Sequence, residues 1–217
     1  MDEMTYRRAA VMWAFIVMRQ GDRLDEAAGE YNKALLDQFW LDRRDAGTLS
    51  GDWASHVEQE VGDGMNWWVT WTFGADQYFF LSAAAQLRKC VLKLPDDGLP
   101  EIPNSKMIRL LRNFVEHWED PSGESAVKLR DMIPDAVPGR AAFTKKDVWI
   151  EGVSTTEIVM WASDVARALR ANAAEAGDVL PDPSKPLPEA RPLRAPLTSW
   201  SGASGSWGGL VIRRGQG

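Results

Sequence analysis

Cysteine is almost absent from this sequence, and that scarcity limits the chemistry it can carry. The single cysteine, Cys90, excludes an intramolecular disulfide and is typical of a protein from a reducing compartment. Cys90 lies within an apolar helical pattern. We therefore expect a buried, unreactive thiol rather than a nucleophile.

Histidine is nearly as scarce, with only His56 and His117 in the chain. The acids that follow His56 (Glu58, Glu60 and Asp63) match no zinc-ligand spacing, so we interpret that segment as a solvated acidic turn. The sequence also lacks a P-loop, a dinucleotide-binding glycine motif and a Ser-His-Asp set. We expect neither a metal ion nor a cofactor.

Long apolar runs are missing too. No stretch approaches the roughly 20 apolar residues that a membrane-spanning helix needs. The first residues, Met1 to Arg8, carry charges of both signs, and the apolar run Ala9 to Met18 has no small-residue cleavage site after it. We expect no signal peptide, no membrane association and a cytoplasmic protein.

An excess of positive charge is also lacking. The formal net charge is -6, which argues against broad, sequence-independent binding of nucleic acid because such binding needs a basic surface. A local basic site remains compatible with this charge. With 45% apolar and 26% charged residues, the composition is that of a globular protein with one substantial core. We expect most of the 11 tryptophans to be core or interface anchors.

Apolar residues recur at helical spacing through most of the chain, which predicts a mainly all-α helical bundle in a domain of residues 1–177. Gly21 reads as a stop between the first two helices, which would then form an antiparallel hairpin. The expected core helices span residues 5–20, 24–44, 66–94, 105–119 and 155–176. The start of the third, NWWVTWTF, is also compatible with an extended segment because it is rich in β-branched and aromatic residues.

Shorter elements are expected between these helices. Residues 48–64 favour a short connecting helix, Ser125 to Met132 another, and residues 142–152 an extended segment or β-hairpin. Ser154 and Glu157 form a capping box at the start of the last helix. Residues 178–217 hold six prolines between Pro181 and Pro196 and then turn rich in Ser and Gly, so we expect a disordered tail.

The segment from Lys106 to Asp120, KMIRLLRNFVEHWED, combines an apolar helical stripe with polar residues able to carry chemistry. Asn104 or Ser105 is expected to cap it. On a continuous helix, Arg112 and His117 lie about 140° apart, so they do not touch on one helix. They can share a cleft if the polar arc faces a groove or if two copies meet across a twofold axis. The apolar stripe consists of Met107, Leu110, Leu111, Phe114 and Trp118.

The string RNFVEH, from Arg112 to His117, resembles the R-x(4-6)-H motif of the HEPN superfamily, in which a polar residue often follows the arginine. This resemblance implies an all-helical dimer that pairs through or beside the motif helix and acts as a metal-independent endoribonuclease. It also implies RNA as substrate and a toxin-antitoxin or phage-defence setting with an antitoxin partner.

The same resemblance implies roles for three catalytic residues. His117 would act as general base or acid on a ribose 2′-hydroxyl or on the leaving oxygen, and Arg112 would stabilise charge on the phosphate. Asn113 would hold the RNA backbone or orient one of the other two.

The residues alone are also compatible with a purely structural interpretation, in which His117 packs beside Trp118 and Arg112 pairs with Glu116 on a solvated face. Two functions of another class therefore stay open. One is a non-catalytic helical module that binds a protein partner, with the Trp-bearing tail as a tether or recognition peptide. The other is an accessory protein of a phage or mobile element.

Overall fold

A computed structural model of the chain describes residues 2–60, 64–95, 98–117, 120, 122–137, 140–143 and 147–182, without the side chains of residues 54, 56, 58–60 and 143. The chain divides into two units, Met1–Pro181 and Asp182–Gly217. All elements below belong to the first unit. The expected tail falls almost entirely outside the described residues.

The described part is mainly helical with one small antiparallel sheet, as the sequence predicts. The sheet has the order β1-β2-β3, with Ala142 opposite Trp149 and Ile150 opposite Val153. The helices are α1 (Glu3–Asp45), α2 (Gly51–Glu60), α3 (Trp67–Val91), α4 (Ser105–Glu116), α5 (Glu124–Met132) and α6 (Thr155–Glu175), and the strands are β1 (Ala141–Phe143), β2 (Val148–Ile150) and β3 (Val153–Ser154).

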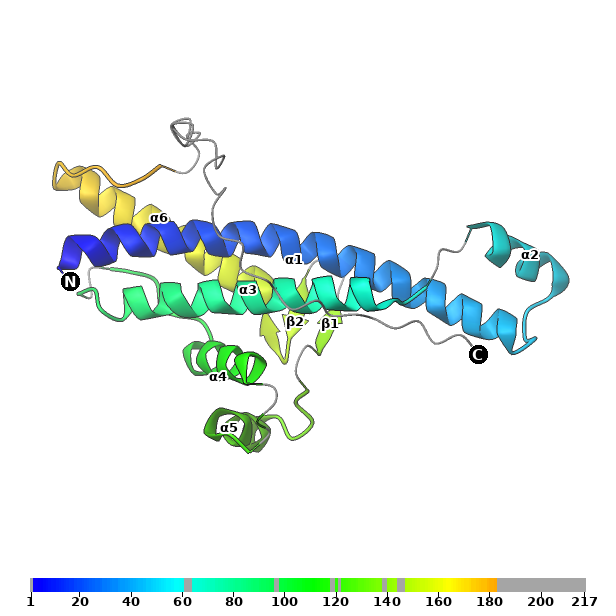
Figure 1. Ribbon diagram of the computed structural model, residues 1–217. Coiled ribbons are helices and arrows are strands. Elements are labelled where there is room, and N and C mark those ends of the chain that lie inside the picture. The colour runs from blue at the N-terminus through cyan, green and yellow to red at the C-terminus, as the bar shows by residue number, and fades with distance from the viewer. Residues whose placement is uncertain are drawn as a thin grey trace, which may run out of the picture. The chain divides into compact units, whose positions relative to one another are not determined.

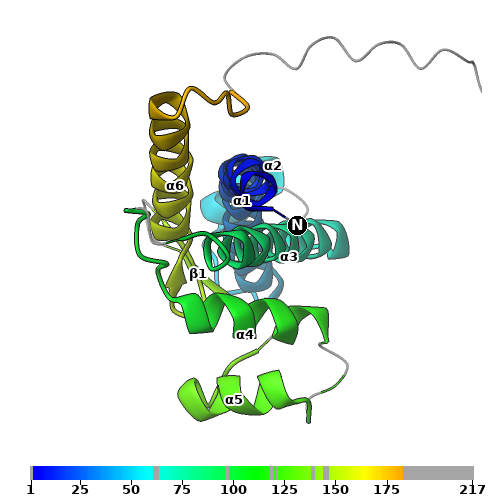
Figure 2. The same cartoon turned by 90° about the vertical axis from the view of Figure 1, so that its left-hand side faces the viewer.

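α1, α3 and α6 form the centre of the core, and α4, α5 and the sheet extend it. α3 runs back along α1, and α6 packs against α1 beside it (Figure 1). α4 lies on the side of α3 away from α1, and α5 lies beyond α4 (Figure 2). The core that these helices share includes the fully buried side chains of Leu24, Phe80, Leu81, Leu87, Ile158 and Leu169.

α1 is one continuous helix of 43 residues, so the prediction of two helices joined at Gly21 is wrong. A glycine inside a helix costs only about 1 kcal/mol relative to alanine, and packing against other helices readily outweighs this cost. Gly21 is buried, and a Cβ placed on it would lie 2.6 Å from Cγ2 of Val159 in α6. Its lack of a side chain therefore serves the close approach of α6 to α1.

α3 begins at Trp67, which settles the choice left open by its aromatic first turns in favour of a helix. The side chain of Asn66 caps it by accepting a hydrogen bond from the backbone N–H of Val69 at 3.0 Å. Further along, the ring of Phe73 stacks on Tyr31 of α1 with centroids 4.7 Å apart. The short helix expected in residues 48–64 is present as α2, where Trp53 stacks on Trp40 of α1.

α4 begins without the expected side-chain cap. Asn104 has a left-handed backbone, with φ of 48°, and its amide donates a hydrogen bond to Oε2 of Glu157 in α6 instead. The Ser105 hydroxyl accepts a hydrogen bond from Nε of Arg88 in α3 at 2.7 Å. Both polar residues therefore tie the start of α4 to neighbouring helices.

The β-hairpin and the last helix form as predicted. The Ser154 hydroxyl accepts a hydrogen bond from the backbone N–H of Glu157 at 3.0 Å, which is half of the expected capping box. α6 ends before Gly177, whose φ of 75° is the left-handed conformation that stops helices. Leu180 is buried beyond that stop, so the folded unit extends past the predicted boundary at residue 177.

Candidate functional site

The motif helix is shorter than the sequence predicts. α4 ends at Glu116, and His117 has φ of -115° and ψ of 41°, which takes the chain out of the helix. The expectation of a helix over 105–119 is therefore wrong at its C-terminal end. Trp118, which the sequence placed on the apolar face, lies outside the described residues.

This early end brings together two side chains that a continuous helix keeps apart. Arg112 donates a hydrogen bond from Nη2 to Oε1 of Glu116 at 2.7 Å, and its Nη1 also contacts Oε2 of the same carboxylate. His117 Nε2 lies 3.7 Å from that Oε2. Arg112 and His117 therefore both approach the same carboxylate oxygen of Glu116 within a single chain.

Asn113 holds Arg112 and joins α4 to α5. Its Oδ1 accepts a hydrogen bond from Nη1 of Arg112 at 3.0 Å, and its amide donates to the Ser125 hydroxyl at 3.2 Å. Both contacts are partly buried. Asn113 therefore restricts the orientation of the Arg112 side chain.

A pocket of about 340 Å³ lies between the end of α4 and the start of α5. It is lined by Asn113, Phe114, His117, Asp120, Gly123, Glu124, Ser125 and Ala126, so two of the three predicted site residues lie on it. Arg112 is not among the lining residues. His117 is the more exposed of the predicted pair, at 63% of its side chain against 25% for Arg112.

Two carboxylates make this pocket less favourable for a phosphate. Hydrogen bonds from the Ser122 side chain and backbone hold the pKa of Asp120 below its usual value, and the nearby His117 adds to this effect. A hydrogen bond from Lys128 lowers the pKa of Glu124 in the same way. Both groups are therefore anionic at neutral pH. Lys128 offsets the charge of Glu124, so Asp120 is the carboxylate of this pocket that an incoming phosphate meets.

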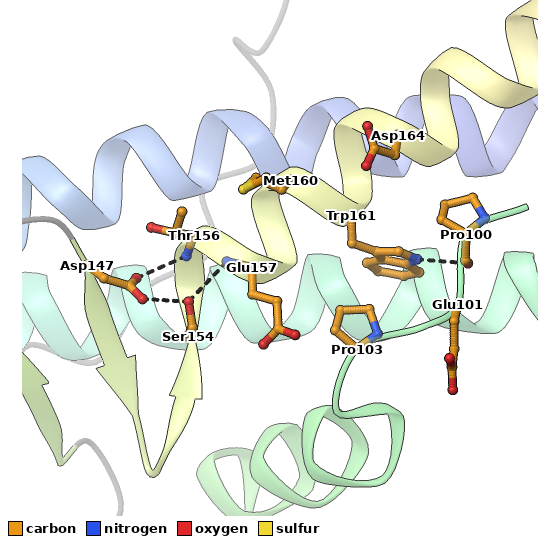
Figure 3. A pocket seen from close by; sticks show the side chains of 10 residues that line it. All are labelled: Pro100, Glu101, Pro103, Asp147, Ser154, Thr156, Glu157, Met160, Trp161 and Asp164. Carbon is orange, nitrogen blue, oxygen red and sulfur yellow. Dashed lines mark hydrogen bonds between the residues drawn. The ribbon is translucent and has the colours of Figure 1, made fainter.

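A second pocket, of about 510 Å³, lies between the loop before α4 and the start of α6 (Figure 3). Four carboxylates line it (Glu101, Asp147, Glu157 and Asp164), together with apolar groups that include Trp161, and no arginine, lysine or histidine does. Asp147 accepts hydrogen bonds from the Ser154 hydroxyl at 2.5 Å and from the backbone N–H of Thr156 at 3.1 Å. These contacts cap α6, and the surplus of negative charge excludes a phosphate ligand.

Cys90 is buried, as predicted, and burial raises the pKa of its thiol. Among the described residues, no three His, Cys, Asp or Glu side chains gather closely enough to hold a metal ion. The acids near His56 are not among the described side chains. Within that described part, no helix is both long enough and apolar enough to cross a membrane.

The structural interpretation of the sequence predicted a pair between Arg112 and Glu116, and that pair is present. Glu116 stands four residues after Arg112, a spacing that predicts a surface ion pair and nothing more. The closeness of His117 to Glu116 depends on where α4 ends, and sequence periodicity does not locate that end. Ser125 was assigned to the start of a separate helix, and no sequence pattern links it to Asn113.

We compared the chain with protein-family models, with curated protein sequences and with solved structures, and none of them matches it.

Proposed function

We propose that this chain is a metal-independent endoribonuclease whose active site lies at the end of α4. The observation that supports this most is that Arg112 and His117 both lie near Oε2 of Glu116. Cleavage of RNA through its ribose 2′-hydroxyl needs a group that moves a proton and a cation that stabilises charge on the phosphate. The resemblance of RNFVEH to the HEPN motif supports the same residues.

In the proposed reaction, the 2′-oxygen of a ribose attacks the adjacent phosphorus, and the bond from phosphorus to the 5′-oxygen of the next nucleotide breaks. The 2′-hydroxyl gives up one proton and the leaving oxygen gains one. The products are a 2′,3′-cyclic phosphate and a 5′-hydroxyl, and no water or metal ion is consumed. His117 moves one of these protons, solvent water exchanges the other without being consumed, and Arg112 stabilises the phosphate oxygens.

Arg112 must be released in part from Glu116 before it can bind a phosphate. Its two contacts with the carboxylate use the same fork of N–H donors that a phosphate would use. The hydrogen bond that Nη1 of Arg112 donates to Oδ1 of Asn113 keeps Arg112 in place during this exchange. Glu116, once released, remains beside His117 and can orient the imidazole, as a carboxylate does in other acid-base pairs.

The test is cleavage of tRNA and total RNA in EDTA by the purified wild type and by Arg112→Ala and His117→Ala. Each substitution is expected to slow cleavage by about a hundredfold or more. Lys106→Ala is the matched control, because Lys106 is an exposed cation in the first turn of the same helix, away from the site. The proposal fails if the wild type does not cleave, or if both site variants cleave as fast as it does.

The resemblance also leads us to propose a toxin-like role with an antitoxin partner. Wild-type protein produced in bacteria should then stop growth, whereas His117→Ala protein at the same level should not. Equal growth with both proteins would remove the support for this role without bearing on cleavage in vitro.

A second candidate function, a non-catalytic helical protein-interaction module, is favoured by exposed aromatic side chains. Trp67, Trp68 and Trp71 at the start of α3 are all more than half exposed, which is unusual for tryptophan away from an interface. This function becomes the leading one if purified protein neither cleaves nor binds RNA.

A further inference from the structure

The outer face of α3 carries a row of large aromatic side chains that no other described element covers. Trp68, Trp71 and Phe79 are 57%, 60% and 50% exposed, and Trp67 beside them is 74% exposed. Trp71 follows Trp68 by three residues and Trp67 by four, and Phe79 follows Trp71 by eight. At about 100° per residue, the four side chains lie within about 120° of one another around the helix. Phe80, Leu81, Ala84 and Leu87 are buried on the opposite side, in the core.

The tryptophans in this row already pack on one another. The rings of Trp68 and Trp71 stack with centroids 5.6 Å apart, and Trp67 meets Trp68 edge-on at 5.5 Å. Tyr78 meets Phe79 in the same edge-on way. These contacts restrict the rings before any partner binds, and the entropy cost of ordering them on binding is correspondingly small.

The row is also free of charge. Between Trp67 and Leu87 the only charged residue is Asp76, and its side chain is buried and paired with Arg23 of α1 at 3.0 Å. An uncharged aromatic face is complementary to another uncharged face. A second copy of the chain presents such a face without like-charge repulsion, although the whole chain carries a net charge of -6.

The row is complementary in shape to the same row on a second copy of the chain. Ala75 is a small, partly buried residue four positions from both Trp71 and Phe79, so helical spacing places a notch between these two larger side chains. In an antiparallel pair of helices that cross at Ala75, Trp71 of one copy faces Phe79 of the other. Phe79 of the first copy likewise faces Trp71 of the second. A twofold axis through the notch therefore brings four aromatic rings into contact.

We propose that two copies of this chain form a twofold dimer through the outer face of α3, crossing near Ala75. Aromatic side chains bury about 150–250 Å² each. Given the exposed fractions of Trp67, Trp68, Trp71 and Phe79, each copy has about 400–600 Å² to bury. With all of this surface covered, the pair buries about 800–1,200 Å² in total, a range that includes the roughly 1,000 Å² that a specific interface should exceed.

This dimer differs from one formed through α4. α4 attaches to α3 at Arg88, which lies 13 residues, or about 20 Å, from Ala75 along the helix. In an antiparallel pair that crosses at Ala75, the two Arg88 positions lie on opposite sides of the crossing point. The two α4 sites are therefore far apart, and each stays open on its own copy.

The test is sedimentation equilibrium of the full-length chain across a wide range of concentration. The wild type should show a monomer–dimer equilibrium, and Trp71→Glu and Phe79→Glu should each raise the dissociation constant by about tenfold or more. Ala75→Trp adds apolar surface but fills the notch, so it should weaken the dimer too. Met12→Glu, an exposed apolar residue of α1, is the matched control and should leave the dimer unchanged.

Far-UV circular dichroism of each variant shows whether α3 is still folded. We expect it to stay folded in Trp71→Glu and Phe79→Glu, because both side chains are at least half exposed. The proposal is overturned if the wild type is monomeric throughout. It is also overturned if the folded Trp71→Glu and Phe79→Glu proteins dimerise as tightly as the wild type, because the interface then lies on another surface. A tighter dimer with Ala75→Trp would contradict a crossing at the notch.

Discussion

The position at which α4 ends decides which side chains lie near His117. Had the helix continued, His117 would point away from Arg112, as its spacing of five residues requires. The turn at His117 instead brings its Nε2 to 3.7 Å from the carboxylate that Arg112 holds. The chemistry proposed for the site therefore depends on Glu116 as much as on the residues of the motif.

Glu116 opposes phosphate binding at this site, so removing its charge should tighten the binding of RNA. In water, two unit charges 4 Å apart interact by about 1 kcal/mol, which corresponds to about fivefold in affinity. We expect Glu116→Gln to lower the Kd for RNA by about that factor, measured by fluorescence anisotropy in a His117→Ala background to prevent cleavage. Glu175→Gln, an exposed carboxylate at the end of α6, is the control. Equal effects of the two changes would show that RNA does not bind beside Arg112.

Asp147 shows how one carboxylate stabilises the start of a helix. Burial raises the pKa of its side chain, but hydrogen bonds from Ser154, Thr156 and Thr155 outweigh burial and hold the pKa below its usual value of 3.8. The stabilisation is therefore complete above the pKa of the unfolded chain. It is lost as the pH falls below 3.8 and through the pKa of the folded protein.

We expect Asp147→Asn to lower the free energy of unfolding by about 1 kcal/mol at neutral pH, because the charged cap of α6 is lost. The difference from wild type should shrink as the pH falls below 3.8, where the unfolded chain binds the proton more readily than the folded protein does. Urea unfolding of the two proteins at neutral pH and at a series of pH values below 3.8 measures this. A difference that is unchanged at the lower pH would show that the charge of Asp147 is not what stabilises α6.

At the scale of elements, sequence periodicity located the helices well and their breaks poorly. The stripes of α3 and α6 and the capping box at Ser154 were readable because each depends on residues close together in the chain. Gly21 was misread as a stop because the reason for it, Val159 of α6, lies far away in sequence. Asn104 failed as a cap for the same reason, since its partner is Glu157.

Gly21→Ala tests the close approach of α1 and α6. Alanine favours the helix by up to about 1 kcal/mol, but its Cβ would lie 2.6 Å from Val159, a side chain with little freedom to move. Overpacking of this kind costs about 1–3 kcal/mol. We expect a net loss of about 1 kcal/mol in thermal or urea unfolding. In a Val159→Ala background the same change should stabilise the protein. A loss of the same size in both backgrounds would contradict this explanation of Gly21.

At the scale of the whole molecule, the folded unit ends later than composition suggests. Gly177 is a clear helix stop, and the proline-rich stretch beyond it predicts a loss of structure. Leu180 nevertheless joins the core, with 7% of its surface exposed, next to Val179 at 87%. The geometry of the turn decides which of two adjacent apolar residues packs against the core. Composition does not predict that geometry.

Leu180→Ala should lower the free energy of unfolding by about 2 kcal/mol, as expected for a truncated leucine in a core. Val179→Ala in the same full-length chain should change it by less than about 0.5 kcal/mol, because its side chain is in solvent. Urea unfolding of both variants beside the wild type measures the difference. Equal effects at the two positions would place the end of the folded unit at Gly177.

The proposed cleavage of RNA at the end of α4, without a metal ion, can be tested with one labelled RNA. The RNA is incubated in EDTA with wild type and with His117→Ala, and the ends of the products are identified. The proposed chemistry predicts a 2′,3′-cyclic phosphate from the wild type and no comparable product from the variant. Equal cleavage by both proteins, or cleavage that appears only when Mg²⁺ is added, would contradict it.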